Sequence, residues 1–248
     1  MNKKLPVNHL IDKIINIIEV EKGLSQNTKI AYTSDINLMN DWFKRKNIDF
    51  LYANEKDFRN LFYYFKTQNF KQNSLSRKLS SMRQFYKILK EEEYIKKNPL
   101  NNIDSFNKEK KLPNALSENL ITLILKKAKE NFVNLEDELF EKKIKSLRTL
   151  VVLEILYSTG MRVSELVCLP LSDFVNITDK LQIKGKGGVY RVVIFNKASL
   201  DTISLWLRYR SISKVFVNNK YMFPERNGNK HIKRQTIYKD ITNLSKSI

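Results

Sequence analysis

Two short segments in the second half of the chain bring basic side chains next to glycines. Arg162 follows Gly160 at a predicted helix junction, a geometry suited to presenting a side chain into a cleft. Further along, Lys184, Lys186 and Arg191 lie in a segment that also holds three glycines, at positions 185, 187 and 188. A guanidinium is planar, permanently charged and able to bind two oxygens at once, whereas an ammonium is a compact charge that can also donate a proton. Both groups suit oxyanion chemistry, but on its own Arg162 would be interpreted as an ordinary surface arginine.

The chain offers few other groups for covalent or metal chemistry. Cys168 is its single cysteine, which excludes an intramolecular disulfide framework and fits a reducing compartment. There are two histidines, His9 and His231, and the second begins the stretch His231-Ile-Lys-Arg234. We expect neither a metal nor a cofactor.

The charge balance is strongly basic, with 45 Lys and Arg against 26 Asp and Glu and a formal charge of +19. A polyanionic partner is the natural interpretation. However, 34 of the basic residues are Lys and the chain is rich in Asn and Ile, the composition that an AT-rich genome produces. Both parts are basic, with net charges of +8 over residues 1–110 and +11 over residues 111–248. Charge alone therefore favours nucleic acid without deciding the matter.

No apolar run has the length of a membrane span. The first apolar stretch, Leu10–Val20, is interrupted by charged residues and predicts an amphipathic helix, not a signal peptide. We expect a cytoplasmic protein with no membrane partner and no small-molecule substrate.

Apolar residues in the first hundred positions recur at helical spacing. Gly23 closes the first predicted helix, and Ser25 or Asn27 can cap the second. The aromatic side chains on these helices are expected to form a core. The four predicted helices span residues 8–20, 25–43, 54–65 and 74–89.

Periodicity lapses in the polar stretch that follows Leu100, which predicts a linker over residues 101–114 between domains at 1–100 and 115–248. Beyond it we expect a helix capped by Ser117, a charged interlude at Asn131–Lys145, and a hairpin with a glycine-rich basic turn between Asp179 and Phe195. Further helices are expected at 147–157, 200–210 and 235–244. The predicted fold class is mainly α (α+β), with one small antiparallel sheet.

Five segments, taken in order, resemble one known family. They are residues 24–35, residues 77–99, the box Leu156-Tyr-Ser-Thr-Gly-Met-Arg-Val-Ser-Glu-Leu166, the hairpin Ile183-Lys-Gly-Lys-Gly-Gly-Val-Tyr-Arg191, and Phe223-Pro224 with Arg234-Gln-Thr236. This series resembles the tyrosine recombinases of the phage integrase family, most closely their Xer branch. The resemblance implies a helical SAM-like core-binding domain followed by a helical catalytic domain with a small antiparallel β-sheet.

The resemblance also implies roles for individual residues. Arg162 matches the first catalytic arginine, which would stabilise the charge that develops on a cleaved phosphodiester. Lys186 matches the catalytic lysine that protonates the leaving 5′-oxygen, and Lys184 is its rival for that role. The candidate DNA contacts are Arg77, Lys78, Arg83, Lys184 and Arg191.

The family mechanism further requires a His-x-x-Arg box and a tyrosine that becomes joined to the 3′-phosphate. His231-Ile-Lys-Arg234 has that spelling, but it lies only 45 residues after Lys186, too early for the family pattern. Tyr238 follows His231 by only 7 residues, again fewer than in the family. We therefore expect an incomplete catalytic domain in which the box and the nucleophile are absent.

The leading hypothesis is a Xer-type site-specific recombination protein that binds duplex DNA at a dif-like site and is inactive alone. Its expected partners are DNA and a related recombinase protomer. Two alternatives remain open: a non-catalytic regulator that occupies recombination sites, and a half-enzyme complemented by a second chain. A basic helical RNA-binding protein is disfavoured because no RNA-module motif is present.

Overall fold

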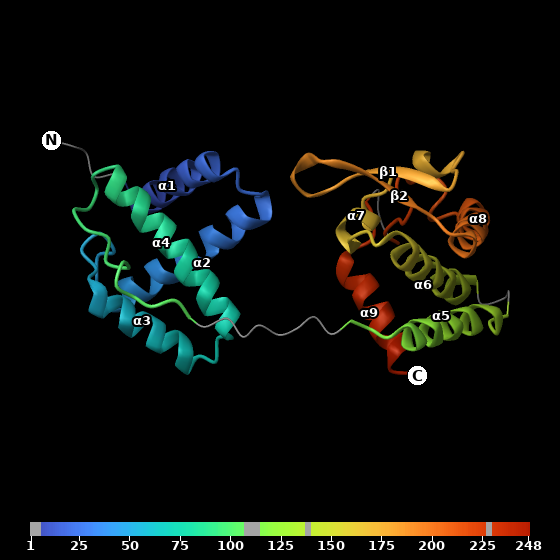
Figure 1. Cartoon of the computed structure of the whole chain (residues 1–248), viewed down its shortest axis with the longest axis horizontal. Coiled ribbons are helices and arrows are strands. Elements are labelled where there is room, and N and C mark those ends of the chain that lie inside the picture. Colours follow the sequence, from blue (N-terminus) through green and yellow to red (C-terminus); the bar gives the residue numbers. More distant parts are fainter. Residues whose placement is uncertain (1–5, 107–114, 137–139, 227–229) are drawn as a thin grey trace. The chain divides into compact units, whose positions relative to one another are not determined.

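The computed structural model of the chain describes residues 6–106, 115–136, 140–226 and 230–248 (Figure 1). The chain divides into two compact units, Met1–Pro113 and Asn114–Ile248. Across the described ranges, the regular structure consists of nine α-helices, short 3-10 turns and one two-stranded antiparallel sheet. The predicted fold class, mainly α with a small antiparallel sheet, is confirmed.

The first unit contains four α-helices whose ends follow local sequence signals. Gly23 adopts φ 56° and ends the first helix, and the Ser25 hydroxyl caps the second by accepting the Thr28 N–H at 3.3 Å. Asn54 and Asp57 form a reciprocal capping box at the third helix. The helices are α1 (Val7–Lys22), α2 (Gln26–Arg45), α3 (Glu55–Thr67) and α4 (Gln72–Glu91).

Aromatic rings fill the core of the first unit. Phe58 meets Phe43 edge-on at 5.2 Å between ring centroids and meets Tyr86 edge-on at 5.0 Å. The Tyr86 hydroxyl donates to the Phe50 carbonyl at 2.7 Å, and burial raises the pKa of this phenol well above its usual value. These side chains bury large apolar areas and fix the helices in place.

The segment that follows α4 packs back onto this unit. Ile103 is buried, and the Phe106 ring lies 5.1 Å from the ring of Phe62. Arg83 donates to the Ser105 hydroxyl at 3.0 Å and to the Ile103 carbonyl. Residues 101–106 of the predicted linker are thus packed against α3 and α4, while 107–114 lie outside the described residues.

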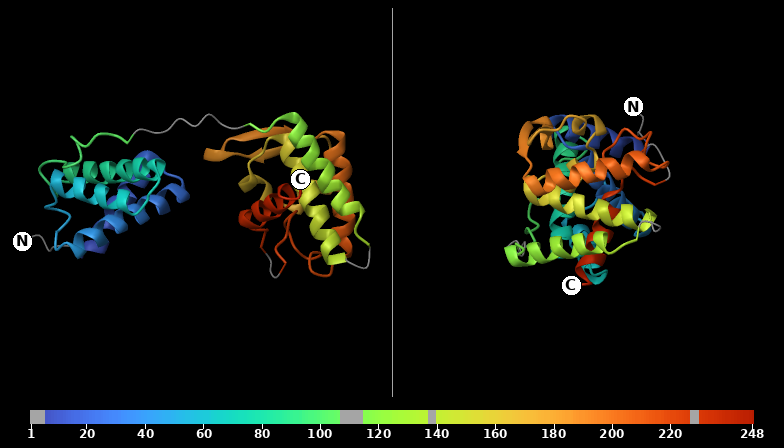
Figure 2. Two further views of the ribbon diagram at one scale, coloured as in Figure 1. Left: turned by 90° about the horizontal axis from the view of Figure 1, so that it is seen from below. Right: turned by 90° about the vertical axis from the view of Figure 1, so that its right-hand side faces the viewer.

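In the second unit, α6 (Phe140–Thr159) contacts both α5 (Glu118–Val133) and α8 (Lys197–Ile212) (Figures 1 and 2). The buried indole of Trp206 on α8 donates to the Met222 carbonyl at 3.0 Å. Asp240 on α9 (Arg234–Ser245) accepts from Arg148 at 2.9 Å and pairs with Lys145 at 3.2 Å, which ties α9 to α6.

The expectation of a charged interlude at Asn131–Lys145 is wrong for most of its length. α5 continues to Val133, and α6 already begins at Phe140. Phe132 and Ile144 are buried, so the apolar faces of both helices extend into the segment despite its charge. Residues 137–139 lie outside the described part of the chain.

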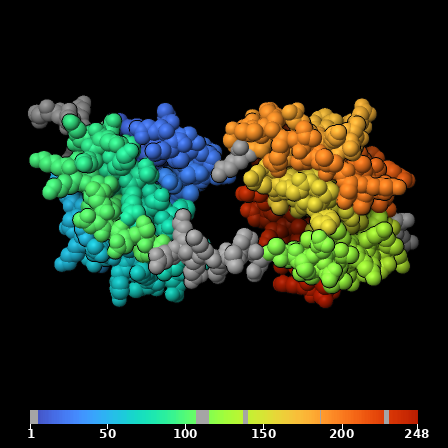
Figure 3. All heavy atoms as spheres, in the orientation of Figure 1, coloured from blue at the N-terminus to red at the C-terminus, as the bar shows by residue number. Residues whose placement is uncertain are grey.

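The small sheet is the hairpin of β1 (Lys180–Lys184) and β2 (Tyr190–Ile194), and its atoms, orange in the space-filling view, lie at the surface of the second unit (Figure 3). A short helix, α7 (Val163–Val167), lies between α6 and this hairpin in sequence, followed by a 3-10 turn at Leu171–Phe174. Within the described ranges, no helix is both long and apolar enough to cross a membrane.

Candidate functional site

Arg162 lies in the short segment that joins α6 to α7 (Val163–Val167), just after Gly160. α6 ends at Thr159, and Gly160 adopts φ 60°, a backbone conformation that side-chain-bearing residues rarely take. Met161 is buried and anchors the turn, while the Arg162 side chain remains 61% exposed at the start of α7. The buried Met161 therefore anchors the backbone next to Arg162, and the guanidinium of Arg162 stays accessible.

One carboxylate gathers two arginines at this point. Glu165 accepts the backbone N–H of Arg162 at 2.8 Å and its guanidinium at 3.0 Å. Arg191, which comes from β2, makes two further bonds to the same carboxylate, at 2.7 Å and 3.1 Å. We call Arg162, Glu165 and Arg191 the Glu165 cluster. It joins the start of α7 to the hairpin, which lies beside α7 in Figure 1.

The electrostatics of the Glu165 cluster favour an anion. The side chain of Glu165 is only 10% exposed, and the hydrogen bonds from Arg191, followed by those from Arg162, lower the pKa of its carboxyl to about 2. The carboxylate is therefore ionised near neutral pH and shared by two guanidinium groups, which leaves one positive charge in excess. Because the Arg162 side chain is more exposed than that of Arg191, the excess positive charge is accessible to a ligand mainly at the guanidinium of Arg162.

The hairpin turn packs against the same cluster. Gly185 donates its N–H to the Val189 carbonyl at 2.7 Å, and a Cβ on Gly185 would lie only 3.0 Å from Nη1 of Arg191. Lys186–Gly188 forms a 3-10 turn, with Gly187 at φ 78° and Gly188 at φ 82°. The backbone of Lys186 thus lies in the turn next to the cluster, and Lys184 is exposed at the end of β1.

In the first unit a second carboxylate gathers basic residues, and we call Asp35, Arg77, Lys78 and Ser81 the Asp35 cluster. Asp35 is fully buried, accepts Lys78 Nζ at 2.9 Å and the Ser81 hydroxyl at 3.1 Å, and also binds Arg77. The Lys78 side chain is only 6% exposed and also lies over the rings of Phe65 and Phe70.

The Asp35 cluster contains two of the three candidate DNA contacts of the first unit, Arg77 and Lys78. Lys78 does not suit a DNA contact, because its ammonium is buried and already paired. Arg77 remains 45% exposed, although one of its nitrogens serves Asp35 and the Ala31 carbonyl. The half-buried Arg83 holds the segment after α4, as described above, instead of projecting from the surface.

The His-x-x-Arg stretch follows α8 in the chain and ends at the first residue of α9. His231 pairs with Pro224 in an isolated bridge, its Nδ1 lies 2.9 Å from the Ile232 carbonyl oxygen, and its ring meets Tyr221 edge-on. Arg234 begins α9, and Tyr238 is 74% exposed on that helix. Among the described residues, no hydrogen bond or ion pair joins these three positions to the Glu165 cluster.

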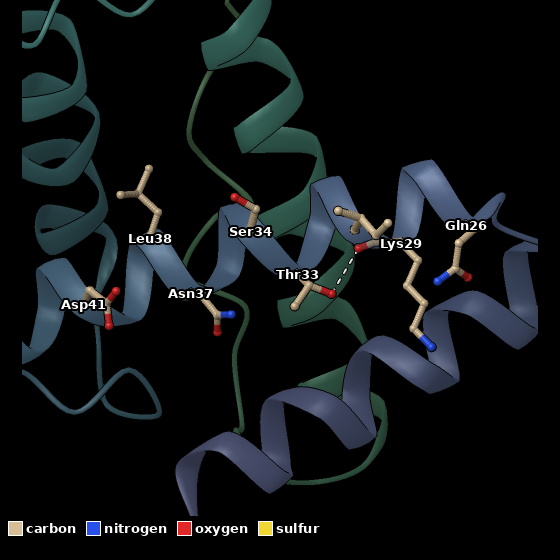
Figure 4. A pocket seen from close by; sticks show the side chains of 8 residues that line it. Gln26, Lys29, Thr33, Ser34, Asn37, Leu38 and Asp41 are labelled. Carbon is tan, nitrogen blue, oxygen red and sulfur yellow. Dashed lines mark hydrogen bonds between the residues drawn. The ribbon is translucent and has the colours of Figure 1, made fainter. Parts of the chain in front are cut away.

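A shallow groove of about 580 Å³ runs along the outer face of α2 (Figure 4). All of its lining residues come from that one helix, and the Thr33 hydroxyl donates back to the Lys29 carbonyl at 3.0 Å. Its lining mixes amide, hydroxyl, aliphatic and charged groups without converging on one point. The groove therefore lacks the concentrated charge of the Glu165 cluster.

Sequence reasoning missed the role of Glu165. A signal was available, because Glu165 stands three residues after Arg162 at the start of a helix, the spacing of a capping box. The same spacing does not reveal Arg191 as a second partner, since that residue lies 26 positions further on.

The sequence matches the phage integrase family over residues 116–248 and the N-terminal SAM-like domain of phage integrases over residues 11–93. It is 31% identical over 220 residues to tyrosine recombinase XerC of Leptospira interrogans, covering 86% of this chain and 68% of that protein. It is 28% identical over 235 residues to tyrosine recombinase XerD of Rhizobium meliloti, covering 95% and 74% of the two chains.

Solved structures show the same fold. The XerH recombinase bound to a palindromic difH substrate superposes with a TM-score of 0.68 at 18% identity, over 95% of this chain and 68% of that one. A lambda integrase dimer bound to a COC′ core site gives a TM-score of 0.65 at 15% identity, over 98% and 81%. The motifs, the fold and these relatives agree, and the chain belongs to the phage integrase family of tyrosine recombinases, with Xer recombinases among its relatives.

Proposed function

We propose that this chain binds duplex DNA as a Xer-type site-specific recombination protein, with Arg162 as its central phosphate contact. The observation that carries the proposal is the arrangement of Arg162 on Glu165. Its backbone is fixed by the carboxylate, and its guanidinium makes one bond there at 3.0 Å and is otherwise 61% exposed. The remaining N–H donors can bind the oxygens of a phosphate in a planar, bidentate manner.

The hairpin supplies the rest of the proposed phosphate site. Lys186 lies on the turn beside the cluster, and in the family resemblance it is the residue that protonates the leaving 5′-oxygen. Lys184, exposed at the end of β1, adds a further positive charge. The formal charge of +19 supports the same ligand class. Among solved structures of the same fold, XerH bound to a difH substrate supports a dif-like target, and a lambda integrase dimer on its core site supports a related recombinase protomer as partner.

Binding is tested by fluorescence anisotropy on a labelled duplex that carries a dif-like sequence, over a range of salt concentrations. We expect the logarithm of the association constant to fall steeply and linearly with the logarithm of salt, because each phosphate contact releases counterions. A scrambled duplex and a single strand of equal length serve as controls. Absence of duplex binding at low salt, or binding that is indifferent to salt, would contradict the proposal.

We further propose that these 248 residues do not cleave DNA by themselves. The support is the spacing of His231 and Tyr238, together with the bonding of His231 to its neighbouring carbonyl. A nicked suicide substrate, on which a covalent complex would accumulate, tests this by denaturing gel electrophoresis. We expect no covalent complex; one that forms and disappears with Tyr238→Phe would overturn the proposal.

A further inference from the structure

Arg191 binds Glu165 differently from Arg162. Arg191 makes a two-pronged contact with both carboxylate oxygens, at 2.7 Å and 3.1 Å, whereas the guanidinium of Arg162 makes a single bond at 3.0 Å. The Arg191 side chain is 36% exposed, against 61% for Arg162. The two arginines of the cluster are therefore not equivalent, and the more firmly bound one is the less accessible.

We propose that Arg191 is a positioning residue that acts through Glu165: it occupies the carboxylate so that Arg162 stays available for a phosphate. This inference rests on the proposed function and replaces the expectation that Arg191 contacts DNA directly. The fork formed by the two terminal nitrogens of Arg191 is already engaged by both oxygens of Glu165, so the end of the side chain that would best bind a phosphate is occupied.

The charge balance explains why Arg191 matters to Arg162. With Arg191 present, one carboxylate faces two guanidinium groups, and one positive charge remains for a ligand. Without Arg191, Glu165 and Arg162 would form a neutral pair one helical turn apart, and a phosphate would have to compete with the carboxylate for the same guanidinium. Removal of Arg191 should therefore weaken DNA binding even though Arg191 does not contact DNA.

Arg191 also connects the cluster to the hairpin turn. It pairs in register with Ile183 across the sheet, and its Nη1 lies where a Cβ on Gly185 would come within 3.0 Å. Gly185 in turn begins the turn that contains Lys186. The side chain of Arg191 thus fixes the start of this turn against α7, which adds a geometric role to the electrostatic one.

The decisive test is a rescue experiment with duplex DNA. We expect Arg191→Met to weaken binding about tenfold, the size of one lost charge-assisted contact. Adding Glu165→Gln to Arg191→Met should restore most of the affinity, because the competing carboxylate is gone. Arg208→Met, which removes an exposed arginine of α8, is the matched control and should change affinity little. A double variant as weak as Arg191→Met would overturn the inference, since it would identify Arg191 as a direct contact.

A second measurement needs no DNA and separates this inference from the proposed function. The Glu165 carboxyl is titrated by carbon NMR in the whole chain. Because the bonds from Arg191 are the main cause of its low pKa of about 2, we expect Arg191→Met to raise that pKa and Arg208→Met to leave it unchanged. An unchanged pKa in Arg191→Met would overturn the inference. If the chain failed to bind duplex DNA while the pKa rose as expected, the proposed function would fail and the coupling of Arg191 to Glu165 would stand.

Discussion

The Asp35 and Glu165 clusters are built from the same parts and end in opposite roles. Each has one well-shielded carboxylate and two basic partners. Both partners of Asp35 come from α4, whereas Glu165 binds Arg162, three residues before it, and Arg191 from β2. In the first unit the carboxylate is fully buried and Lys78 is only 6% exposed. In the second unit the carboxylate is 10% exposed and Arg162 extends into solvent at 61%.

The two clusters differ in whether a basic group that pairs with the carboxylate is buried or exposed to solvent. A buried ammonium paired with a buried carboxylate is not available to a ligand, and removal of either partner leaves the other charge buried and uncompensated. An exposed guanidinium that keeps most of its donors can exchange water for a ligand. The Asp35 cluster is thus a structural element of the first unit, and the Glu165 cluster is the candidate binding site.

The largest expected effect is on the stability of the first unit. Asp35→Leu should lower its free energy of unfolding by about 3–5 kcal/mol, because it leaves Lys78 buried without a counter-charge. Trp42 lies in the first unit and Trp206 in the second, so Trp42 fluorescence in a Trp206→Phe background reports the first unit alone during denaturant unfolding.

The matched control for this prediction is Asp35→Leu combined with Lys78→Met, which replaces both charges by apolar groups. It should lose less stability than Asp35→Leu alone. A loss below about 1 kcal/mol in the single variant would mean that the buried pair does not hold the first unit together.

A smaller effect is expected from acid in the second unit. The pKa of Glu165 is about 2 in the folded chain, below its ordinary value of 4.5, so the stability that its ion pairs contribute is complete above pH 4.5 and is lost as the pH falls toward 2. After allowance for the exposure of its partners, we expect a loss on the order of 2 kcal/mol. Trp206 fluorescence in a Trp42→Phe background measures it, and Glu165→Gln should remove this part of the pH dependence.

Gly185→Ala should destabilise the second unit by about 1 kcal/mol, because the new Cβ would crowd Nη1 of Arg191 and the Val189 carbonyl. Denaturant unfolding followed by Trp206 measures the change. In a double-mutant cycle, Arg191→Met should remove much of this cost, since the crowded atom is gone. Strict additivity of the two substitutions would contradict the packing of Arg191 against the turn.

The smallest effect is expected for Arg77→Ala in the first unit. Arg77 is 45% exposed, and Asp35 keeps Lys78 and Ser81 when it is removed. The free energy of unfolding should fall by less than about 1 kcal/mol, as for a pair with one partner at the surface. A loss as large as that of Asp35→Leu would show that Arg77, not Lys78, is the main partner of Asp35.

The sequence predicted most of the helices because their signals are local. Ser25 and Ser117 cap the helices for which they were considered, and Gly23 closes the first one. Asn54 caps the helix that was predicted to span residues 54–65. The hairpin was also predicted, from the strand-like spacing of its apolar residues and from the glycines of its turn. The prediction placed the ends of α5 and α6 too far apart, because the stretch between them is rich in charged residues. Buried apolar side chains nevertheless continue into it from both helices.

The two carboxylate clusters were harder to predict because their members are distant in sequence. Asp35 lies 43 residues from Lys78, and Glu165 lies 26 from Arg191. A partial signal existed for the first cluster, since Lys78 takes the place of an apolar residue in the stripe of Leu75, Met82 and Phe85. A charge in such a stripe predicts a buried partner, but it does not identify which carboxylate supplies it.

We propose that Arg162, held by Glu165, is where this chain contacts a DNA phosphate. The most direct measurement is the slope of the logarithm of duplex affinity against the logarithm of salt for the wild-type chain, Arg162→Ala and Arg208→Ala. We expect the slope to become shallower by about 0.9 for Arg162→Ala, the change for one phosphate contact, and to stay the same for Arg208→Ala. An unchanged slope for Arg162→Ala would contradict the claim.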